Sequence, residues 1–393
     1  MPVRKVLVLS GLQIYPPESG GMLRTSSLIN ALVARGHDVT VYSMVGRKPD
    51  YLAGKPSGTS IIGERLREYV DRGRCWAALQ FIAYRLRLPP FWITFVLWLH
   101  TPRELRKLLA SCDAVIVDFP FLFPPATRTR KPAALNTHNV ESDLWRQSWI
   151  KRRVRAIEGR AARSVQQVFC CSAGDRAFFA SLDGGAPVSI VPNGIDPARF
   201  AGIGAERNAL RASLGYNDED RVLFLAASSF GPNVEALEWL VRFATEHQAL
   251  LARKRLQFLV AGSVSKQPFQ RPQLRAVGAV ARIEPYFAAA DLAFNAVFRG
   301  SGTNVKMAEF IAAGLPILTT NSGMRGYDLV DGEDCVAFTP ETLATVLAEN
   351  TILDDPDRLR NMATSAFEKN KRQIDMNWCV EPLVTWIEGA LTA

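Results

Sequence analysis

Histidine and clustered cysteine are scarce in this chain of 393 residues. It contains four histidines and six cysteines, and none of the cysteines forms a C-x-x-C pair or a Cys/His cluster with zinc spacing. The composition therefore argues against a dedicated metal site, and we expect none. Scattered cysteines without a disulfide framework are typical of reduced core thiols, so we expect a cytoplasmic protein.

Long hydrophobic runs and dinucleotide-binding motifs are also missing. The longest apolar candidate, FWITFVLWL at 91–99, has nine residues, whereas a membrane-spanning helix needs about 20. The run at 6–12 is too short for an export signal and is typical of a buried parallel strand. The absence of G-x-G-x-x-G argues against a dinucleotide site. We therefore expect no membrane span, and nothing in the composition requires a cofactor.

Positive charge is concentrated in the first half of the chain. The net charge is +9: residues 1–200 hold 28 Lys and Arg against 15 Asp and Glu, whereas the remainder holds 19 against 23. A basic first half of +13 beside a second half of −4 indicates that the first half faces an anionic partner. No nucleic-acid-binding motif accompanies this charge, so we expect no nucleic-acid partner.

Apolar runs alternate with segments of helical periodicity in both halves of the chain. This alternation predicts two α/β domains, each with a parallel sheet covered by helices on both faces. Strands are expected at 5–10, 38–43, 113–118, 133–136, 166–171, 188–191, 221–227, 256–261, 292–296 and 316–320. Helices are expected at 22–35, 102–110, 141–163, 233–252, 303–313 and 376–391. In doubly wound domains ligands bind at the carboxyl ends of the strands, here in a cleft between the domains.

The segment GSGTNVKMAEFIAAGLPILTTNSGMRG, at 300–326, carries the strongest chemical signal. Gly300 and Gly302 allow the backbone to turn close to a ligand, and a helix capped by Thr303 or Asn304 follows. The start of a helix attracts phosphate. Lys306 lies in the first turn, and Glu309 is the one acid of an otherwise apolar helix. The pattern predicts a phosphate at the helix start and hydroxyl groups one turn further along.

This segment resembles the donor-binding part of glycosyltransferase family 4, whose members look like G-x-G-T-x-x-K-x-x-E. Four further phrases are similar to family landmarks and occur in the expected order: SGGMLRTSSLINALVARGHDVTVYS at 19–43, THNVES at 137–142, CCSAGDRAFF at 170–179 and VPNGIDPARF at 191–200. The resemblance implies the GT-B fold, with two Rossmann-like domains facing across a cleft. It also implies a retaining transferase that uses a nucleoside diphosphate sugar as substrate, without a cofactor or a bound metal.

The resemblance implies a division of labour along the chain. Residues 1–196 form an acceptor-binding domain, residues 197–375 bind the nucleotide sugar, and a helix within 376–393 returns to the first domain. The implied acceptor is a hydroxyl of a glycan or a lipid-linked glycan, with cell-surface polysaccharide synthesis as a plausible setting. Backbone groups within 262–285 are expected to read the base.

On the donor side, the resemblance assigns Glu309 to the ribose hydroxyls and Gly302, Thr303 and Lys306 to the diphosphate. The chain departs from the family in two places: Ser301 stands where many members have a second glutamate, and AASSFGPN at 226–233 lacks the usual Arg and Lys. Arg299 and Lys306 are expected to supply that charge. The expected donor residues are Gly20, Gly21, Ser229, Asn233, Arg299, Ser301, Gly302, Thr303, Asn304, Lys306 and Glu309.

Each of these residues also has a structural alternative. Glu309 can instead pair with Arg299 or Arg325, Arg299 can be a solvated side chain, and Asn233 can be a helix cap after Pro232. The glycine pair at 20–21 can serve turn geometry only.

On the acceptor side, Arg24, His138 and Glu141 are the expected residues, and His138 and Glu309 are the expected catalytic ones. His138 follows the apolar run that ends in AALNTHN, so it should point from a strand's carboxyl end into the cleft. The alternative is a structural histidine. Glu141 either orients His138 or starts the next helix.

Two basic segments complete the pattern. IKRRVRAIEGRAARS at 150–164 places six cations on one helix, and residues 64–100 interleave arginine with Trp, Phe and Tyr. Such surfaces suit an anionic membrane, which would make the enzyme peripheral on the inner face of the cell membrane, or a long acceptor with a diphosphate. The alternative is a solvated helix face beside a core-filling helix pair.

Two other functions stay open from the sequence. A GT-B epimerase of nucleotide sugars would need several acids and histidines around the sugar. A binding protein with a degenerate site is conceivable because of Ser301 and the missing Arg/Lys pair.

Overall fold

The computed structural model describes residues 3–17, 19–47, 50–51, 53–299 and 303–389. The chain divides into two compact units: Met1–Pro192 together with Met376–Ala393, and Asn193–Asp375. Residues 193–196, which the sequence placed with the first domain, belong to the second unit. Ser301 and Gly302, expected in the donor site, lie outside the described residues.

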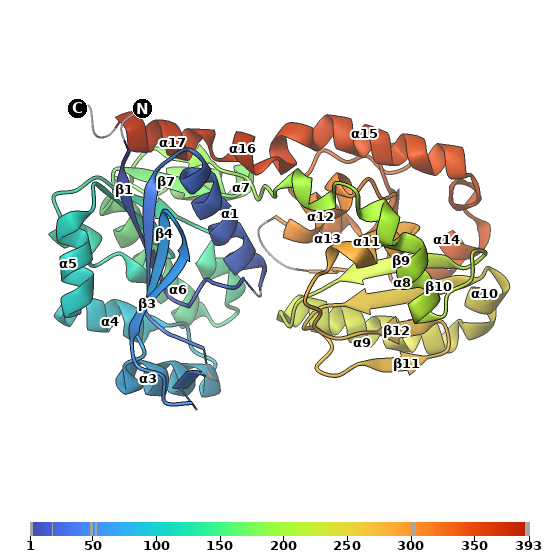
Figure 1. The fold of residues 1–393 in the computed structure, drawn as a ribbon, viewed down its shortest axis with the longest axis horizontal. Helices are drawn as coiled ribbons and strands as arrows, with labels where there is room; N and C mark the ends of the chain where they lie inside the picture. Colours follow the sequence, from blue (N-terminus) through green and yellow to red (C-terminus); the bar gives the residue numbers. More distant parts are fainter. Residues whose placement is uncertain (1–2, 18, 48–49, 52, 300–302, 390–393) are drawn as a thin grey trace. The chain divides into compact units, whose positions relative to one another are not determined.

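Among the described residues, the first unit contains one eight-stranded sheet (Figure 1). Its spatial order is β3 (Gly58–Gly63), β4 (Leu66–Val70), β2 (Asp38–Ser43), β1 (Lys5–Ser10), β5 (Ala114–Asp118), β6 (Ala133–Asn136), β7 (Gln167–Cys170) and β8 (Val188–Ile190). Neighbouring strands run parallel except β3 and β4. Because a parallel sheet is covered on both faces, its central strands are mostly apolar, as in the fully buried β5, where Asp118 at the carboxyl end is the one polar residue.

Helices pack on both faces of this sheet. They are α1 (Gly20–Ala34), α3 (Arg74–Arg85), α4 (Phe91–Leu99), α5 (Arg103–Ser111), α6 (Ser148–Arg163), α7 (Ala173–Ala180), α16 (Met376–Cys379) and α17 (Glu381–Gly389), with short 3-10 turns η1 (Pro120–Leu122), η2 (Ala126–Arg128) and η3 (Glu141–Leu144). Leu383 and Ile387 of α17 share a buried cluster with Leu28 and Ile116, so the C-terminal residues complete the core of the first unit.

The second unit contains a seven-stranded sheet within the part of the chain that the structure describes. Its order is β11 (Phe269–Arg271), β12 (Leu274–Ala276), β10 (Leu256–Ala261), β9 (Arg221–Ala226), β13 (Leu292–Asn295), β14 (Ile317–Thr319) and β15 (Val336–Ala337). Only the pair β11–β12 is antiparallel among these described strands. Both sheets thus have the doubly wound α/β architecture that the sequence predicts.

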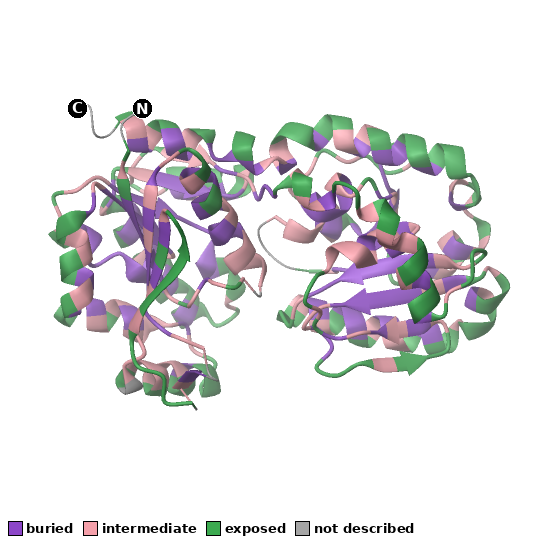
Figure 2. Ribbon diagram, in the orientation of Figure 1, coloured by how far each residue is buried: buried purple, intermediate pink, exposed green. Residues whose placement is uncertain are grey.

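The second sheet is also covered by helices on both faces, and its central strands are buried, whereas the edge strand β11 is largely exposed (Figure 2). The helices are α8 (Arg207–Leu214), α9 (Gly231–Glu246), α10 (Gln248–Arg253), α11 (Glu284–Ala289), α12 (Val305–Ala312), α13 (Asn321–Met324), α14 (Leu343–Glu349) and α15 (Pro356–Ile374), with 3-10 turns η4 (Pro197–Phe200), η5 (Ile203–Glu206) and η6 (Thr351–Asp354). Gly262 closes the turn after β10 with φ +118°, where a Cβ atom would lie 2.1 Å from the carbonyl oxygen of Ala227. Only glycine allows the backbones to approach so closely there.

All ten strands expected from the sequence are present, with ends shifted by no more than two residues. The strands that the sequence analysis missed, β3, β4, β11, β12 and β15, lie at or next to sheet edges. The burial pattern of β4 alternates, and β3 is largely exposed, so neither forms the continuous apolar run that marks a central parallel strand.

Candidate functional site

In the second unit, the expected donor residues gather beyond the carboxyl ends of β9 and β13. Ser229 and Asn233 follow β9, and Arg299 follows β13. The backbone N–H of Ser229 donates to the Ser263 hydroxyl at 3.1 Å, so the turns after β9 and β10 are joined. In doubly wound domains this is the edge at which ligands bind.

Lys306 and Asn233 connect the starts of two helices. The Lys306 Nζ donates to the Asn233 Oδ1 at 2.7 Å, while the Asn233 amide donates to the Ser228 carbonyl at 3.1 Å. Asn233 is therefore not the cap of α9, which begins two residues earlier at Gly231. Burial lowers the pKa of Lys306 to about 8, although Glu309 opposes the shift. A cation beside two helix N-termini forms an environment that favours an anion.

Glu309 lies one helical turn after Lys306 and is buried, with 6% of its surface exposed. Its Oε1 accepts from the Arg199 Nη1 at 3.3 Å, and Arg199 also donates through Nε to Glu284 at 2.9 Å. The sequence suggested Arg299 or Arg325 as the ion-pair partner, but the partner found is Arg199. Burial raises the pKa of Glu309, and Arg199 opposes the rise. The carboxylate therefore sits in a polar network inside an otherwise apolar helix face.

The residues before α12 are held by hydrogen bonds within the same unit. Asn304 occupies the cap position, as expected, but its side chain makes no capping bond; its carbonyl accepts from the Tyr327 hydroxyl at 3.0 Å. The Asn193 amide donates to the Thr303 hydroxyl. Asn193 belongs to the phrase VPNGIDPARF, which served above as a family landmark, and it was not among the expected site residues.

Arg299 forms a surface ion pair instead of reaching into the site. Its guanidinium donates to both carboxylate oxygens of Glu235, at 2.7 Å from Nε to Oε2, and its side chain is 56% exposed. This is the solvated alternative that the sequence left open.

In the first unit, Gly20 and Gly21 begin α1, and the Ser19 hydroxyl caps the helix by accepting from the Met22 N–H at 3.4 Å. A Cβ atom on Gly21 would lie 3.4 Å from the Nδ1 of His138, closer than most such contacts. The glycine therefore keeps the backbone close to this face of the imidazole ring.

His138 is held by an acid that the sequence analysis did not single out. Its Nε2 lies 3.0 Å from the Asp118 Oδ1 at the carboxyl end of β5, and Asp118 also accepts from Asn136 at 2.6 Å and Thr25 at 2.9 Å. Burial would raise the pKa of Asp118, but His138 and these donors lower it below its ordinary value. An ionised Asp118 fixes Nε2 as the protonated nitrogen and leaves Nδ1 toward Gly21.

A strained residue supports the histidine from one face. The Phe119 ring stacks on His138, with centroids 4.5 Å apart and planes 12° apart. Phe119 has φ +124°, which L side chains rarely adopt. Strain of this kind is concentrated at functional sites. The sequence did contain a feature that could have identified Asp118: it is the one polar residue of the otherwise apolar strand AVIVD, at the carboxyl end of the strand.

Arg24 is buried inside the first unit. It is 1% exposed, and its guanidinium donates to the Pro192 carbonyl at 3.0 Å and to Asn136 at 3.1 Å. Arg24 is therefore an internal brace that joins α1 to the end of β6 and to the turn after β8, and its expected acceptor-side role stays a prediction.

Glu141 begins the 3-10 turn η3, the second of its two expected roles, and His138 takes Asp118 as its acid partner. Burial and the neighbouring Glu158 raise the pKa of Glu141 to about 7. Burial likewise raises the pKa of Glu158 to about 7, and its Oε2 has no hydrogen-bond partner among the described residues. Two acids, Glu141 of η3 and Glu158 of α6, thus lie buried next to each other.

Replacing Glu158 by glutamine is expected to stabilise the first unit at alkaline pH. The pKa of Glu158 in the folded protein lies above the ordinary value of 4.5. The folded state is therefore most stable when Glu158 is protonated, and the free energy of unfolding falls as the pH rises from about 4.5 to about 7. The free energy of unfolding should rise in Glu158→Gln by about 2 to 3 kcal/mol more at pH 8 than at pH 5. Urea unfolding at both pH values measures the difference.

The matched control is Glu104→Gln on α5, an exposed acid of the same unit that pairs with Lys107 at 2.6 Å. It should change stability by less than about 1 kcal/mol at either pH. An equal gain for Glu158→Gln at pH 5 and pH 8 would contradict the raised pKa.

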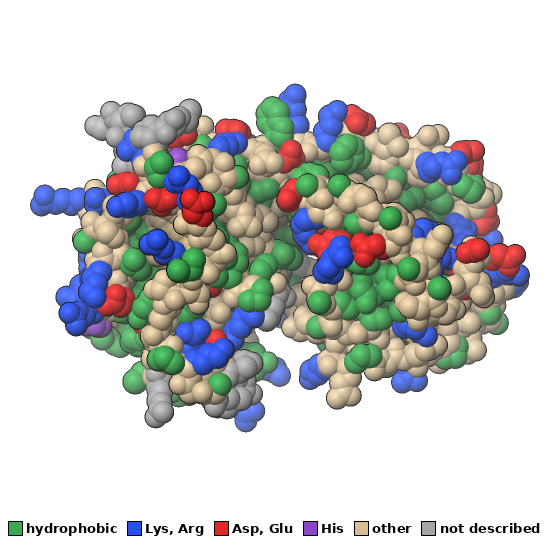
Figure 3. All heavy atoms as spheres, in the orientation of Figure 1, with side chains coloured by type: hydrophobic (Ala, Val, Ile, Leu, Met, Phe, Trp, Pro, Cys, Tyr) green, Lys and Arg blue, Asp and Glu red, His purple; other side chains and the backbone are tan. Residues whose placement is uncertain are grey.

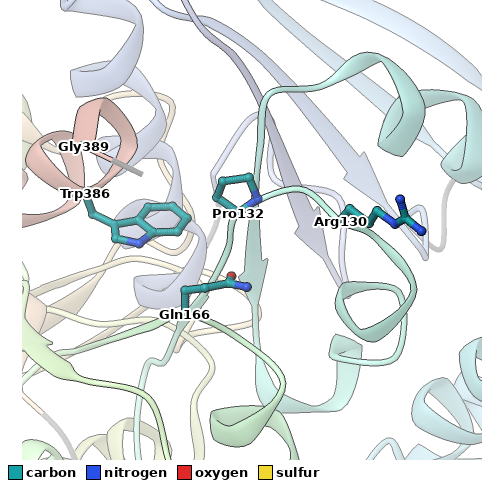
Figure 4. A pocket seen from close by; sticks show the side chains of 5 residues that line it. All are labelled: Arg130, Pro132, Gln166, Trp386 and Gly389. Carbon is teal, nitrogen blue, oxygen red and sulfur yellow. The ribbon is translucent and has the colours of Figure 1, made fainter. Parts of the chain in front are cut away.

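A separate pocket lies at the amino ends of the strands of the first sheet, opposite the ends that carry Asp118 and His138 (Figure 4). Pro132 and Gln166 directly precede β6 and β7, and Trp386 of α17 forms another wall. Because the amino ends of the strands border it, this pocket does not belong to the candidate site. Among the described residues no group of three or more His, Cys, Asp or Glu could hold a metal ion, and no helix there has the length and apolar character needed to cross a bilayer.

Two family models match successive parts of the chain. The model for Glycosyltransferase Family 4 matches residues 20–199, and the model for Glycosyl transferases group 1 matches residues 220–353. The first match includes His138 and Arg199, and the second includes Lys306 and Glu309.

Individual relatives agree with these matches. Glycogen synthase from Mycobacterium tuberculosis is 25% identical over 406 positions, which cover 93% of this chain and 89% of that protein. Sucrose-phosphate synthase from Thermosynechococcus elongatus has a TM-score of 0.68 at 14% identity, covering 99% of both chains. The Anabaena protein HepE in complex with UDP has a TM-score of 0.67 at 14% identity, covering 98% of this chain and 100% of its own. The architecture described above is thus that of GT-B glycosyltransferases.

Proposed function

Since models for Glycosyltransferase Family 4 and for Glycosyl transferases group 1 match successive parts of the chain, we propose that it transfers a hexose from a nucleoside diphosphate sugar to a hydroxyl group of a glycan or lipid-linked acceptor. The observation that carries the proposal is the spacing on α12. Lys306, hydrogen-bonded to Asn233, lies three residues before Glu309, so the two side chains follow each other along one face of the helix. In a bound nucleoside diphosphate, the diphosphate would lie against Lys306, and the ribose would lie one helical turn further along, against Glu309.

The donor is bound by the second unit in this proposal. Lys306 and the start of α12 hold the diphosphate, and the two oxygens of Glu309 accept hydrogen bonds from the ribose hydroxyls. Arg199 favours the ionised form of Glu309 and orients its carboxylate until the donor arrives. HepE has been crystallised with UDP and with UDP-glucose, which supports a uridine donor for this chain as well.

The acceptor is bound by the first unit, beside Gly21 and His138. As the bond to the leaving diphosphate breaks, negative charge grows on its oxygens. We propose that Lys306 and the helix N-terminus stabilise this charge without a metal ion. His138, oriented by Asp118, contacts the sugar or the acceptor hydroxyl through Nδ1. Retention of configuration follows the family resemblance.

We further propose a role in cell-surface polysaccharide synthesis. A lipid-linked acceptor and a water-soluble nucleotide sugar meet at the inner face of the cell membrane, so we place the enzyme in the cytoplasm at that surface. The basic first half of the chain supports this location.

A thermal-shift panel tests the donor site. UDP, GDP, ADP and TDP are added to wild type and to Glu309→Ala, without and with magnesium. Stabilisation by one nucleotide without magnesium, lost in the variant, supports the proposal; at about 100 times Kd it amounts to about 2.7 kcal/mol. No shift with any nucleotide would overturn it and favour a binding protein with a degenerate site.

The affinity for the nucleotide is expected to fall above pH 8. The pKa of Lys306 is lowered to about 8, so the empty site loses its cation as the pH rises past this value. Each further pH unit should weaken binding by about tenfold until the neutral-site affinity is reached. Titration of the identified nucleotide between pH 6.5 and 9.5 measures this dependence.

Lys306→Met is the control for this titration, because it removes the titrating group and keeps an apolar stem of similar length. The variant should bind weakly at every pH without the break near pH 8. The same break in Lys306→Met would assign the effect to another group.

A further inference from the structure

The helices α3 and α4 expose an unusually apolar surface, which we call the α3–α4 surface. Seven of its large hydrophobic side chains are at least 51% exposed: Phe81, Ile82, Tyr84, Leu86, Phe95, Trp98 and Leu99. They lie within 19 consecutive positions, from 81 to 99. Single exposed hydrophobic residues are common on soluble proteins, but a contiguous cluster marks an interaction site.

The exposure is not caused by a loosely attached helix. Ile93 and Leu97 on the inner face of α4 are 4% and 1% exposed and belong to the core of the first unit. The Thr94 hydroxyl donates to the Phe121 carbonyl at 2.8 Å, and Arg128 donates to the Leu97 carbonyl at 3.0 Å near the end of the helix. The helix FWITFVLWL is apolar all round, so the fold buries one face and leaves the other uncovered.

The two helices contact each other directly. The Trp76 and Trp92 rings stack with centroids 6.2 Å apart, and the Trp92 indole donates to the Gln80 side chain at 3.3 Å. The link between the helices is restricted by Arg87, with φ +50°, and by the two prolines at 89–90. The exposed side chains of α3 and α4 are thus presented together.

The charge of this segment has one sign. From residue 72 to residue 103 the sequence contains five arginines and no aspartate or glutamate. Arg72 is paired with Asp50 at 3.0 Å, so it adds no free charge to the surface. Arg85 and Arg87 are exposed between Tyr84 and Leu88. Figure 3 shows blue cationic and green apolar side chains next to each other at the end of the first unit that α3 forms.

We propose that the α3–α4 surface docks on a lipid bilayer with anionic headgroups. The aromatic and aliphatic side chains enter the interface of the bilayer, and the arginines contact lipid phosphates. This inference rests on the proposed function, because it specifies how the enzyme reaches a lipid-linked acceptor. It adds the location of the surface and the residues that insert.

Charge complementarity distinguishes this partner from a second copy of the chain. In a symmetric dimer the same patch meets itself, so the arginines of two α3–α4 surfaces would oppose each other without acids to neutralise them. The other basic segment, α6, fits a bilayer less well, because its exposed residues are chiefly cationic and Trp149 is its single large apolar side chain that is more than half exposed within the described helix.

Vesicle sedimentation tests the proposal. The full chain is mixed with phosphatidylcholine vesicles, with and without 30% phosphatidylglycerol, at low and high salt. Wild type should bind at least tenfold better to the anionic vesicles, and salt should weaken this binding. The double substitution Phe81→Ser/Phe95→Ser should reduce binding at least tenfold, and Arg85→Glu at least threefold.

The matched control is Trp149→Ser/Arg152→Glu on α6, which removes one exposed aromatic residue and one exposed cation from the other basic surface. It should bind anionic vesicles like wild type. Equal binding by wild type and Phe81→Ser/Phe95→Ser, or loss in the α6 control alone, would overturn the proposal. A dimer in sedimentation velocity without lipid, dissociated by Phe81→Ser/Phe95→Ser, would instead identify a second copy as the partner.

The nucleotide-induced thermal shift separates this result from the donor proposal. Variants that lose vesicle binding should keep the wild-type shift with the identified nucleotide, which also shows that they are folded. Loss of the nucleotide shift in wild type would contradict the transferase proposal without affecting the vesicle result.

Discussion

Replacing Glu309 by alanine is expected to lower the kcat/KM for sugar transfer by about 100- to 10,000-fold. Two hydrogen bonds between an ionised carboxylate and the ribose hydroxyls are lost, each worth about 1.5 to 3 kcal/mol. Arg199 also loses one of its two acidic partners and keeps Glu284. Steady-state kinetics with the nucleotide sugar identified by the thermal-shift panel measures the change.

Two further variants show whether the carboxylate itself is required. Glu309→Gln keeps the shape of the side chain and one acceptor oxygen, so it should retain more activity than Glu309→Ala. Glu284→Gln weakens the other ion pair of Arg199 and leaves Glu309 in place, so it should cost less than about tenfold. If Glu284→Gln were as damaging as Glu309→Ala, the ion-pair network would matter through stability and not through the donor.

Asp118→Asn is expected to lower kcat by about 100-fold and to leave the affinity for the free nucleotide unchanged. Asp118 accepts hydrogen bonds from Thr25 and Asn136 and faces the Nε2 of His138. The NH2 group of an asparagine at this position would face these donors without accepting from them, so His138 would lose the hydrogen bond that orients its ring. The nucleotide is proposed to bind the second unit, which contains none of these residues. Turnover and nucleotide titration, carried out on the same variant, separate the two effects.

Asp118 acts through His138, so the double variant Asp118→Asn/His138→Ala should be no slower than His138→Ala alone. The control is Asp113→Asn at the other end of β5, where the carboxylate accepts from the Lys5 N–H at 2.8 Å. That variant should turn over like wild type. Additive losses in the double variant would show that Asp118 does not work by positioning the histidine.

Periodicity predicted the central strands of both sheets because these strands are buried on both faces. β1, β5, β9 and β10 each contain at least four consecutive apolar residues, and a run of this kind has few alternatives in an α/β chain. The edge strands β3 and β11 carry mixed side chains, since only part of their surface is covered. Their pairing depends on partners distant in the sequence, which a local pattern does not contain.

The sequence predicted part of the candidate site, as it predicted part of each sheet. Lys306 and Glu309 stood out because a charged residue on an apolar helix needs a partner. The partners themselves, Asn233 for Lys306 and Arg199 for Glu309, are separated from them by 73 and 110 positions. The arginine that looked available by sequence proximity, Arg299, is bound to Glu235 at the surface.

The sequence by itself determined the α/β class, the order of the central elements, the family and the helix that carries Lys306 and Glu309, because these features depend on local periodicity and on short-range spacing. Only the tertiary structure decided that Asp118 holds His138, that Arg24 is buried as a brace and that one face of α4 stays uncovered. Each of these depends on which distant side chains meet when parallel strands align their carboxyl ends, and on how much apolar surface the finished core can cover.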